Sequence, residues 1–420
     1  MGEILDLAEQ AWQGRYDKHW HPSGAREEIA PDLFFLNTFA NVSVARTPAG
    51  LVLVDTGSHL GRRQTFEAVR HCDPSRIFAS IYTHGHVDHA FGLPPFLAEA
   101  QDKNWERPRI VGHQNVGARF DRYRATAGYN AAINTRQFGM AVPWPTEFNY
   151  PDLTYDEGLQ LDAGGYTFEL HHARGETDDH TWIFWPERRV LFTGDQFIWV
   201  TPNAGNPQKV QRYAADWAQS LRLMSKCDAE VLVPGHGLPI FGVARVRQAL
   251  GETAHWLEHL LHETLERMNA GLPLDAILQE VKPPPELAGR PYLQPVYDEP
   301  EFVVRNIWRL YGGWYDGTPS HLKPAPESQI GREVASLAGG VRALVARARE
   351  LASVGDLRLA SHLVDWAVAA APEDRDAHAA RAEIYTARVG GERALMTRGV
   401  FGAAARESGQ KSGRTQSSPA

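Results

Sequence analysis

The chain has 420 residues and a formal net charge of −8, with 43% hydrophobic and 22% charged residues. Its length exceeds one typical domain, and its composition is that of a globular chain able to bury a large core. The negative charge excludes the basic surface that nucleic acids require, so we expect no nucleic-acid partner.

The sequence carries no targeting or membrane-spanning signal. Its first ten residues lack a basic stretch followed by an apolar core, so we expect no signal peptide. No apolar run approaches the roughly 20 residues that cross a bilayer. Cys72 and Cys227 are too few for a disulfide framework and favour a reducing compartment. We therefore predict a cytoplasmic protein without a membrane span.

Short apolar runs separated by Gly and Pro turns predict a layered α/β domain over residues 20–280. The predicted strands are Leu33–Leu36, Val42–Ala45, Leu51–Val54, Ile77–Tyr82, Tyr166–Leu170, Trp182–Trp185, Val190–Phe192 and Val231–Val233. Several of these runs are followed by His, Asp or Glu, whose side chains are able to bind metals. The loops after these runs are therefore the candidate functional segments.

Four side chains able to bind metal follow the predicted strand at 77–82. His84, His86, Asp88 and His89 lie within six residues in the pattern H-x-H-x-D-H. Extended backbone places side chains two apart on one face, so the first two histidines point the same way. Imidazole and carboxylate are the ligands of zinc sites that keep one position open for water. A polar turn without metal is the alternative, and the density of ligands favours the metal site.

The motif also has room for a second ion. Asp88 and His89 can face a position beside the one served by the first two histidines. Two ions about 3.5–4 Å apart can share a hydroxide, which forms near neutral pH because coordination lowers the pKa of water to about 7.

Three further candidate ligands follow later strands. Glu176 comes after the strand at 166–170, Asp195 after the strand at 190–192, and His236 after the strand at 231–233, each directly preceded by glycine. Metal-binding side chains commonly lie on loops at strand ends in this way. The sequence thus predicts a metal centre assembled from four separate loops.

Residues 115–158 form a segment rich in Tyr, Asn, Arg and Pro with little periodicity. A long irregular insertion in a compact domain is usually functional or disordered. We expect it to be a lid or pocket wall over the metals, with a surface excursion as the alternative.

The rest of the chain is expected to be helical or irregular. Residues 242–269 have helical periodicity, and three histidines on that helix are either a polar contact face or a second metal site: His255, His259 and His262. Residues 281–330 are predicted as a linker and 331–390 as a helical domain. The helix-start residues Asp356 and Pro372–Glu373 divide that domain, and 391–420 are predicted as a disordered tail.

The H-x-H-x-D-H motif and the later ligands resemble the signature of the metallo-β-lactamase superfamily. The resemblance implies an αββα sandwich and a binuclear hydrolase with two divalent ions, expected to be zinc. It also implies that Asp55, in Leu-Val-Asp-Thr-Gly, supports the metal loop by hydrogen bonds, and that a Gly-Asp segment supplies the bridging carboxylate. The implied metal ligands are His84, His86, Asp88, His89, Glu176, Asp195 and His236.

Glu176 stands where most of the superfamily has histidine. His171, His172 and His180 are the alternatives nearby, and we expect them to support the ligands instead. A glutamate at this place resembles the alkyl sulfatase branch. The segment Thr126–Gly139 is similar to the substrate-side insertion of that branch. Asn306–Leu322 is similar to the segment that leads into its C-terminal all-helical dimerisation domain. Leu359–Ala367 is similar to the helix pair of that domain, which implies a homodimer.

The resemblance implies that a metal-activated water or hydroxide cleaves a small anionic substrate, an alkyl sulfate ester. Asp88 and His89 are the predicted catalytic residues. The residues predicted to orient the anionic head group are Asn203, Lys209, Arg136 and Tyr129. Lys209 and Arg212 are the nearest cations where the family has an arginine, and a planar guanidinium binds sulfate differently from an ammonium. The alternatives are therefore a lactone, thioester or phosphoester hydrolase, or a non-catalytic metal-binding protein.

Overall fold

Two β-sheets form the centre of the computed structural model, which describes residues 2–18 and 20–413. One sheet has seven strands in the order β1-β2-β3-β4-β5-β6-β7, and the other has six in the order β13-β12-β11-β10-β9-β8. The first sheet contains β1 (Arg26–Ala30), β2 (Leu33–Leu36), β3 (Val42–Thr47), β4 (Gly50–Val54), β5 (Ile77–Ile81), β6 (Arg109–His113) and β7 (Leu153–Tyr155). The second contains β8 (Gly158–Asp162), β9 (Thr167–His172), β10 (Thr181–Trp185), β11 (Val190–Gly194), β12 (Val231–Pro234) and β13 (Ile240–Phe241).

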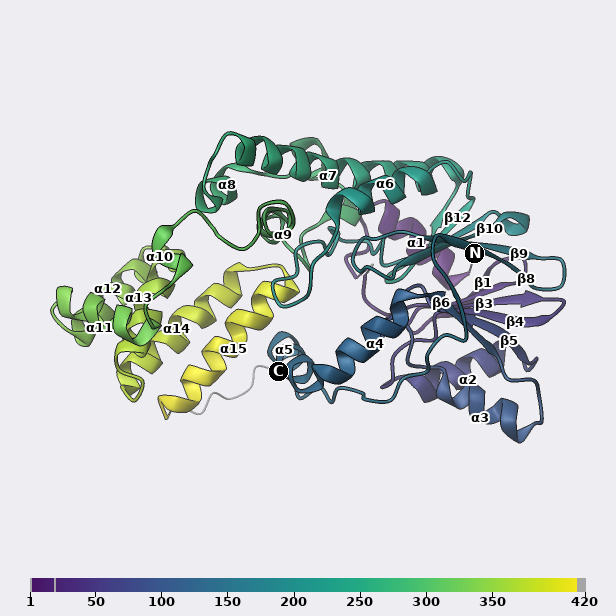
Figure 1. Cartoon of the computed structure of the whole chain (residues 1–420), viewed down its shortest axis with the longest axis horizontal. Coiled ribbons are helices and arrows are strands. Elements are labelled where there is room, and N and C mark those ends of the chain that lie inside the picture. The colour runs from purple at the N-terminus through teal and green to yellow at the C-terminus, as the bar shows by residue number, and fades with distance from the viewer. Residues whose placement is uncertain (1, 19, 414–420) are drawn as a thin grey trace.

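Helices cover the outer face of each sheet (Figure 1). Between the sheets, Val52 and Ile81 of one pack with Phe168 and Trp185 of the other in a common buried core. The first sheet is covered by α2 (Arg62–Cys72), α3 (Pro94–Asp102) and α4 (Asn115–Ala125). The second is covered by α1 (Glu3–Trp12), α6 (Ala214–Met224), α7 (Val243–Asn269), α8 (Leu274–Glu280) and α9 (Pro300–Gly312). The predicted αββα sandwich is therefore confirmed.

The eight predicted strands are all present, with boundaries that differ by at most a few residues. Strands β4 to β7 run parallel, and so do β11 and β12. In such sheets the loops after the carboxyl ends of parallel strands gather at one edge and form the binding crevice. The residues after β4, β5, β11 and β12 are therefore brought together there.

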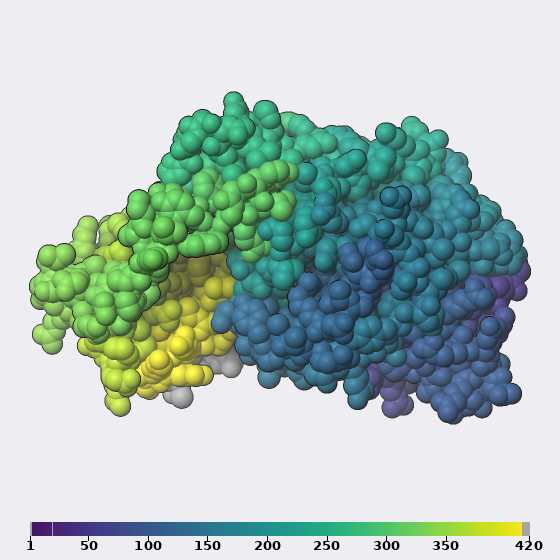
Figure 2. All heavy atoms as spheres, in the orientation of Figure 1, coloured from purple at the N-terminus to yellow at the C-terminus, as the bar shows by residue number. Residues whose placement is uncertain are grey.

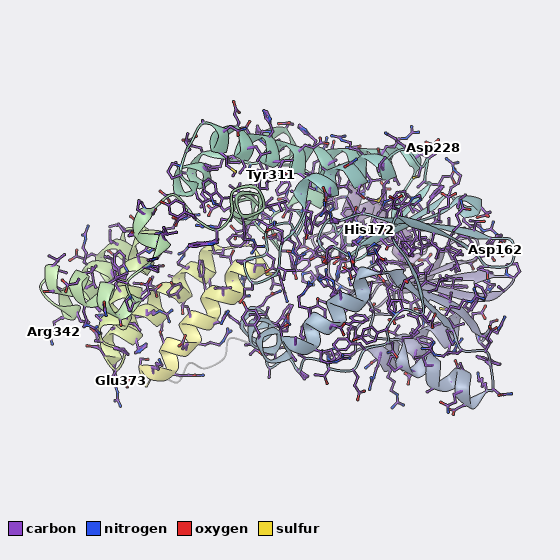
Figure 3. All side chains as sticks on the ribbon, in the orientation of Figure 1. Asp162, His172, Asp228, Tyr311, Arg342 and Glu373 are labelled. Carbon is purple, nitrogen blue, oxygen red and sulfur yellow. The ribbon has the colours of Figure 1, made fainter. Side chains whose placement is uncertain are left out.

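The C-terminal helices form a separate bundle with its own buried core, which includes Leu344, Val364 and Ile384. After the short α10 (Pro319–Leu322), the bundle contains α11 (Glu327–Leu337), α12 (Val341–Ser353), α13 (Leu357–Ala370), α14 (Arg375–Gly391) and α15 (Leu395–Lys411). Figure 2 shows it as a lobe at the end of the molecule away from the strands. In Figure 3, Arg342 and Glu373 mark this end and Asp162 the other, with His172 between them.

The segment at 115–158 differs from the irregular insertion that was predicted. Its first half forms α4 and α5 (Ala127–Phe138). The buried face of α5 is largely polar, with Asn130, Asn134 and Gln137 turned inward. Because an apolar stripe is the signal for an amphipathic helix, this helix was invisible to a search for hydrophobic periodicity.

The predicted linker and tail were also wrong in part. Within 281–330, helix α9 buries Val303, Val304 and Ile307 in the core that covers the second sheet. Within 391–420, residues 395–411 form α15, which packs against α14 and α5. Tertiary contacts stabilise this Gly- and Ala-containing helix, although its composition favours disorder. Residues 414–420 lie outside the described residues.

Across residues 2–18 and 20–413, no helix combines the length and the apolar character needed to cross a membrane.

Candidate metal centre

Asp55, at the end of β4, ties the H-x-H-x-D-H loop to the sheet. The Thr83 backbone N–H and hydroxyl donate to its two carboxylate oxygens, each at 2.8 Å. His89 Nδ1 lies 2.8 Å from Asp55 Oδ2, so the other ring nitrogen of His89 points into the site. Asp55 therefore orients the loop by hydrogen bonds, which is the supporting role expected for it.

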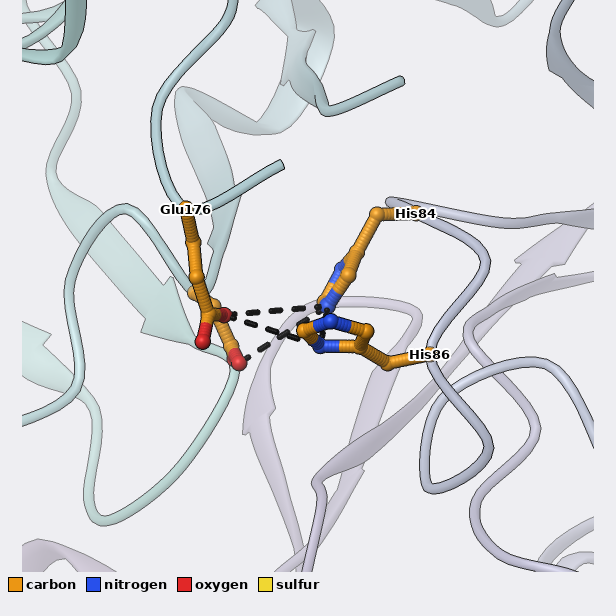
Figure 4. Close-up of side chains that lie close together, drawn as sticks. His84, His86 and Glu176 are labelled. Atoms are coloured by element: carbon orange, nitrogen blue, oxygen red, sulfur yellow. Dashed lines mark hydrogen bonds and ion pairs between the residues drawn. The ribbon is translucent and has the colours of Figure 1, made fainter. Parts of the chain in front are cut away.

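The first group of donor atoms comes from loops of both sheets. It consists of His84 Nε2, His86 Nδ1, Glu176 Oε2 and Asp195 Oδ2. Glu176 Oε2 lies 3.9 Å from His84 Nε2 and 3.7 Å from His86 Nδ1 (Figure 4). Asp195 Oδ2 lies 3.8 Å from His84 Nε2. Four buried or nearly buried donors from three loops thus face one point.

A second group lies beside the first and uses the other oxygen of Asp195. Asp88, His89 and His236 form this group. Asp195 Oδ1 lies 3.2 Å from His89 Nε2 and 3.4 Å from His236 Nε2, and Asp88 Oδ2 lies 3.6 Å from His236 Nε2. One carboxylate therefore spans the two groups of donors.

These donor sets fit divalent cations. Glu176 Oε2 and Asp195 Oδ1 are buried and have no hydrogen-bond partner in the described structure, and buried carboxylate oxygens normally have one. Nitrogen and oxygen ligands about 2.0–2.2 Å from zinc would lie about 3.3–3.6 Å apart at the corners of a tetrahedron. Most of the separations above are close to that spacing, so the His/Asp/Glu cluster is suited to hold divalent metal.

Burial sets the protonation of the first pair of histidines. It holds the pKa of His84 and of His86 well below the ordinary value for histidine. Both rings are therefore neutral, the form in which imidazole binds metals. Burial alone would raise the pKa of Asp195, but His89 and His236 hold it well below its usual range. Asp195 is therefore ionised, the form in which a carboxylate can bind a metal.

Hydrogen bonds at the remote ring nitrogens orient the imidazoles. His84 Nδ1 lies 3.0 Å from Thr83 Oγ1, and His236 Nδ1 donates to the Phe39 carbonyl. Such contacts select the ring orientation that aims the free nitrogen at a metal. The Phe39 ring also packs edge-on against His236 and is 48% exposed.

Glu176 is held by two side chains of the loop that follows β11. Arg212 Nη1 lies 2.5 Å from Glu176 Oε1, and Asn203 Nδ2 donates to the same oxygen. The Glu176 carbonyl also accepts from Arg212 Nη1 at 2.9 Å. Asn203, predicted to orient substrate, thus contacts a predicted ligand, and its Oδ1 is buried without a partner.

The other predicted substrate residues lie further out. The Lys209 ammonium lies 5.6 Å from the centroid of the partly buried Trp144 ring, and burial lowers its pKa to about 8. Arg136 on α5 donates to Gln208 Oε1 at 2.8 Å. Tyr129, on the same helix, is 62% exposed.

The nearby histidines take supporting or unrelated places. His180 Nε2 accepts the Asp195 backbone N–H at 3.1 Å, His172 stacks on His113, and His171 stacks on Trp182. The two donor groups above contain none of these three.

Two of the histidines on α7 contact other segments. His255 binds Glu286 and His259 binds the Lys282 carbonyl. His262 is exposed and lies beside Glu263 and Glu266, so the α7 histidines do not form one cluster.

Sequence reasoning missed the side chains that hold the ligands in place. Arg212 was considered only as a cation for substrate, and Arg119 and Asp179 were not considered. A buried Arg and a buried Asp leave no periodic signal, because each is recognised only when its distant partner is known.

Two family models match the chain. Residues 37–236 match the metallo-beta-lactamase superfamily, and residues 274–411 match alkyl sulfatase dimerisation. The first match contains every predicted metal ligand, and the second contains the C-terminal bundle.

Named relatives match most of this chain. A linear primary-alkylsulfatase from a Pseudomonas species is 28% identical over 80% of this chain and 68% of its own length. An (R)-specific secondary-alkylsulfatase from Pseudomonas is 27% identical over 85% of this chain and 58% of its own. The alkyl/aryl-sulfatase BDS1 of Saccharomyces cerevisiae is 22% identical over 80% of this chain and 54% of its own. The chain thus spans 54–68% of the length of these relatives.

A solved structure shares the fold. The stereoselective inverting sec-alkylsulfatase Pisa1 from Pseudomonas superposes with a TM-score of 0.84 at 24% identity, covering 92% of this chain and 65% of that one. The likeness therefore includes the sandwich and the helical bundle together.

Proposed function

We propose that this chain is a metal-dependent hydrolase of alkyl sulfate esters. It belongs to the metallo-beta-lactamase superfamily through residues 37–236 and to the alkyl sulfatase dimerisation family through residues 274–411. The observation that carries the proposal is the position of Asp195, whose two oxygens face two adjacent groups of metal-binding side chains. The alkylsulfatases among its relatives support the substrate class.

The proposed centre holds two zinc ions. His84, His86 and Glu176 would hold one, and Asp88, His89 and His236 the other, with Asp195 between them. When bound, two such ions lower the pKa of water at the site and stabilise negative charge on the departing group. Asp88 and His89 are the ligands that we assign to the reacting side of the centre.

The protein contributes orientation and charge. Arg212 and Asn203 hold one oxygen of Glu176 and leave the other free for an ion. Asp55 and the Phe39 carbonyl aim His89 and His236 at the second group. Because these contacts are already made in the folded chain, binding of metal and substrate needs little reorganisation.

We assign the recognition of the anionic head group to Lys209. Its ammonium lies near enough to Asp88 for the two charges to interact, and the structure described gives it no carboxylate partner within ion-pair distance. Asn203 belongs to the same loop, and we assign Arg136 and Tyr129 of α5 to the outer wall of the substrate path. Lys209 provides one point charge, so it would bind a sulfate oxygen without the two-pronged geometry of arginine.

The experiment combines metal analysis with a substrate panel. Purified protein would be analysed for zinc and assayed with dodecyl sulfate, a secondary alkyl sulfate, an acyl lactone, a thioester and an aryl phosphate. Release of sulfate by protein that holds two ions per chain supports the proposal. Turnover of only the lactone, thioester or phosphate would assign the site to that other ester, and full metal content without any turnover would indicate a non-catalytic protein.

The match to alkyl sulfatase dimerisation leads us to propose a homodimer formed through this region. Its N-terminal part carries large exposed apolar side chains, namely Tyr311 (51% exposed), Trp314 (69%) and Leu322 (53%). Large apolar side chains exposed in this way are candidates for a contact surface, and the match supports a second copy of the chain as the occupant.

A further inference from the structure

Three consecutive residues at the start of β10, Asp179 to Thr181, each contact a different part of the metal centre. Asp179 Oδ2 accepts the Gly85 backbone N–H at 2.8 Å, between the ligands His84 and His86. His180 Nε2 accepts the Asp195 backbone N–H at 3.1 Å, and the Thr181 N–H donates to the Thr83 carbonyl at 2.7 Å. This short run therefore joins the loops after β5 and β11.

The guanidinium of Arg119 holds Asp179 and its neighbour Asp178 in place. Arg119 of α4 places Nε 2.8 Å from Asp179 Oδ1, and its Nη2 donates to Asp178. Arg119 is 2% exposed and Asp179 is fully buried. A carboxylate without solvent needs a counter-charge to stay ionised. Burial would raise the pKa of Asp179, but Arg119 and the Gly85 N–H hold it below its usual range.

Two glycines of the ligand loops lie in close contact with these side chains. A Cβ atom on Gly85 would lie 3.0 Å from both Arg119 Cδ and Asp179 Oδ2. A Cβ atom on Gly194, whose φ is +49°, would lie 2.7 Å from His180 Nε2. The two glycines allow Arg119, Asp179 and His180 to approach the backbone of the ligand loops directly.

His180 also faces a ligand with its ring. It stacks on His84, with ring centroids 5.1 Å apart and planes 26° apart, and it is fully buried. Its acceptor nitrogen holds the peptide of Asp195, the residue that spans both donor groups. Asp179 and His180 thus orient the two separate ligand loops from adjacent positions.

We propose that Arg119, acting through Asp179, is a positioning residue that sets the geometry of His84 and His86, and that neighbouring His180 does the same for Asp195. This inference rests on the proposed metal site and adds to it. The first helix of the 115–158 segment is then part of the metal centre's support. Contacts that orient metal ligands typically change metal affinity about 10- to 100-fold when removed.

The test uses Co(II) as the probe on the full chain. Metal-free wild type, Arg119→Met and Asp179→Asn would be titrated with Co(II), and the visible absorption bands of the loaded proteins compared. We expect both variants to bind the first ion about 10- to 100-fold more weakly, with shifted bands. In Asp179→Asn the amide nitrogen must face either Arg119 or Gly85, two donors that it cannot bind.

Two comparisons separate positioning from general damage. Arg124→Met changes a guanidinium on the same helix that pairs with Asp121 at the surface, and should bind Co(II) as the wild type does. Arg119→Lys keeps the charge but makes one contact where arginine makes two, and should recover part of the affinity. If Arg119→Met does not fold, Asp179→Asn still tests the positioning role, because asparagine has the same shape as the native residue.

The outcome distinguishes this inference from the proposed function. If the wild type binds two Co(II) ions and both variants match it in affinity and absorption, the positioning role is overturned while the metal site stands. If the wild type binds no Co(II), the proposed metal site fails, and the positioning role fails with it.

Discussion

Arg212 Nη1 lies 2.5 Å from Glu176 Oε1, and neither side chain is more than 3% exposed. Because of this contact, the two oxygens of the Glu176 carboxylate have different roles. One oxygen pairs with the guanidinium and accepts a hydrogen bond from Asn203, while the other faces His84 and His86 without a hydrogen-bond partner. One oxygen of Glu176 is thereby left facing the first group of donors from a fixed direction.

Replacing Arg212 with methionine should destabilise the metal-free protein by about 3–5 kcal/mol, because Glu176 becomes an uncompensated buried charge. The loss should shrink when metal is present, since a bound cation supplies the missing charge. Urea denaturation with and without zinc measures both values. Arg174→Met removes an exposed ion pair with Asp216 and should cost about 0–1 kcal/mol. An equally small loss for Arg212→Met would contradict the role of the pair.

Glu176→Ala should lose one of two metal ions per chain together with sulfate release, since it removes a ligand from the first group. Metal content by atomic emission and activity on dodecyl sulfate would be measured on the same sample. Glu169→Ala, on the neighbouring strand β9, is the control and should retain its metal content and its sulfate release. Full metal content in the Glu176 variant would remove this residue from the ligand set.

His180→Phe should lower kcat while KM for the sulfate ester stays nearly constant. The phenyl ring can keep the stack on His84, but the Asp195 N–H loses its acceptor, and an unsatisfied buried donor costs about 1–3 kcal/mol. Steady-state kinetics and thermal denaturation give the two readouts. His171→Phe, which keeps a ring against Trp182 away from the ligands, should behave as the wild type. Unchanged kcat in His180→Phe would show that Asp195 needs no such anchor.

The affinity for an anionic ester should fall as the pH rises through about 8. Burial lowers the pKa of Lys209 to about 8, so its positive charge is present below that pH and absent above it. KM for an alkyl sulfate should therefore increase on the alkaline side, whereas KM for a neutral ester should not. In Lys209→Arg the increase should disappear, because arginine stays protonated. The same alkaline increase in Lys209→Met would assign it to another group.

Trp314→Asp should weaken the homodimer, since it places a charge in the exposed apolar patch at the start of the dimerisation region. Light scattering after size exclusion would measure the mass over a dilution series. Leu223→Asp changes a residue of α6 that is 47% exposed and lies outside that region, and should leave the mass unchanged. A Trp314 variant as dimeric as the wild type would place the contact elsewhere in the dimerisation region.

Much of the sandwich was predictable because its strands are continuous apolar runs. Sequences such as Leu51–Val54 and Val231–Val233 are buried on both faces, so each is recognisable without its neighbours. Helix α5 was not predictable in this way, since it turns Asn134 and Gln137 inward. Helix α15 was missed for a related reason: its stability comes from α14 and α5, which lie beside it only after folding.

The sequence by itself determined which side chains could bind metal. The imidazoles and carboxylates of H-x-H-x-D-H and of the later Glu176, Asp195 and His236 are metal-binding groups whatever the fold. Only the tertiary structure decided how they are used. Asp195 spans two donor groups, and Arg212 divides the carboxylate of Glu176, because packing of the two sheets gathers loops that are far apart along the chain. Distances between such loops depend on the whole folded core, which no local pattern encodes.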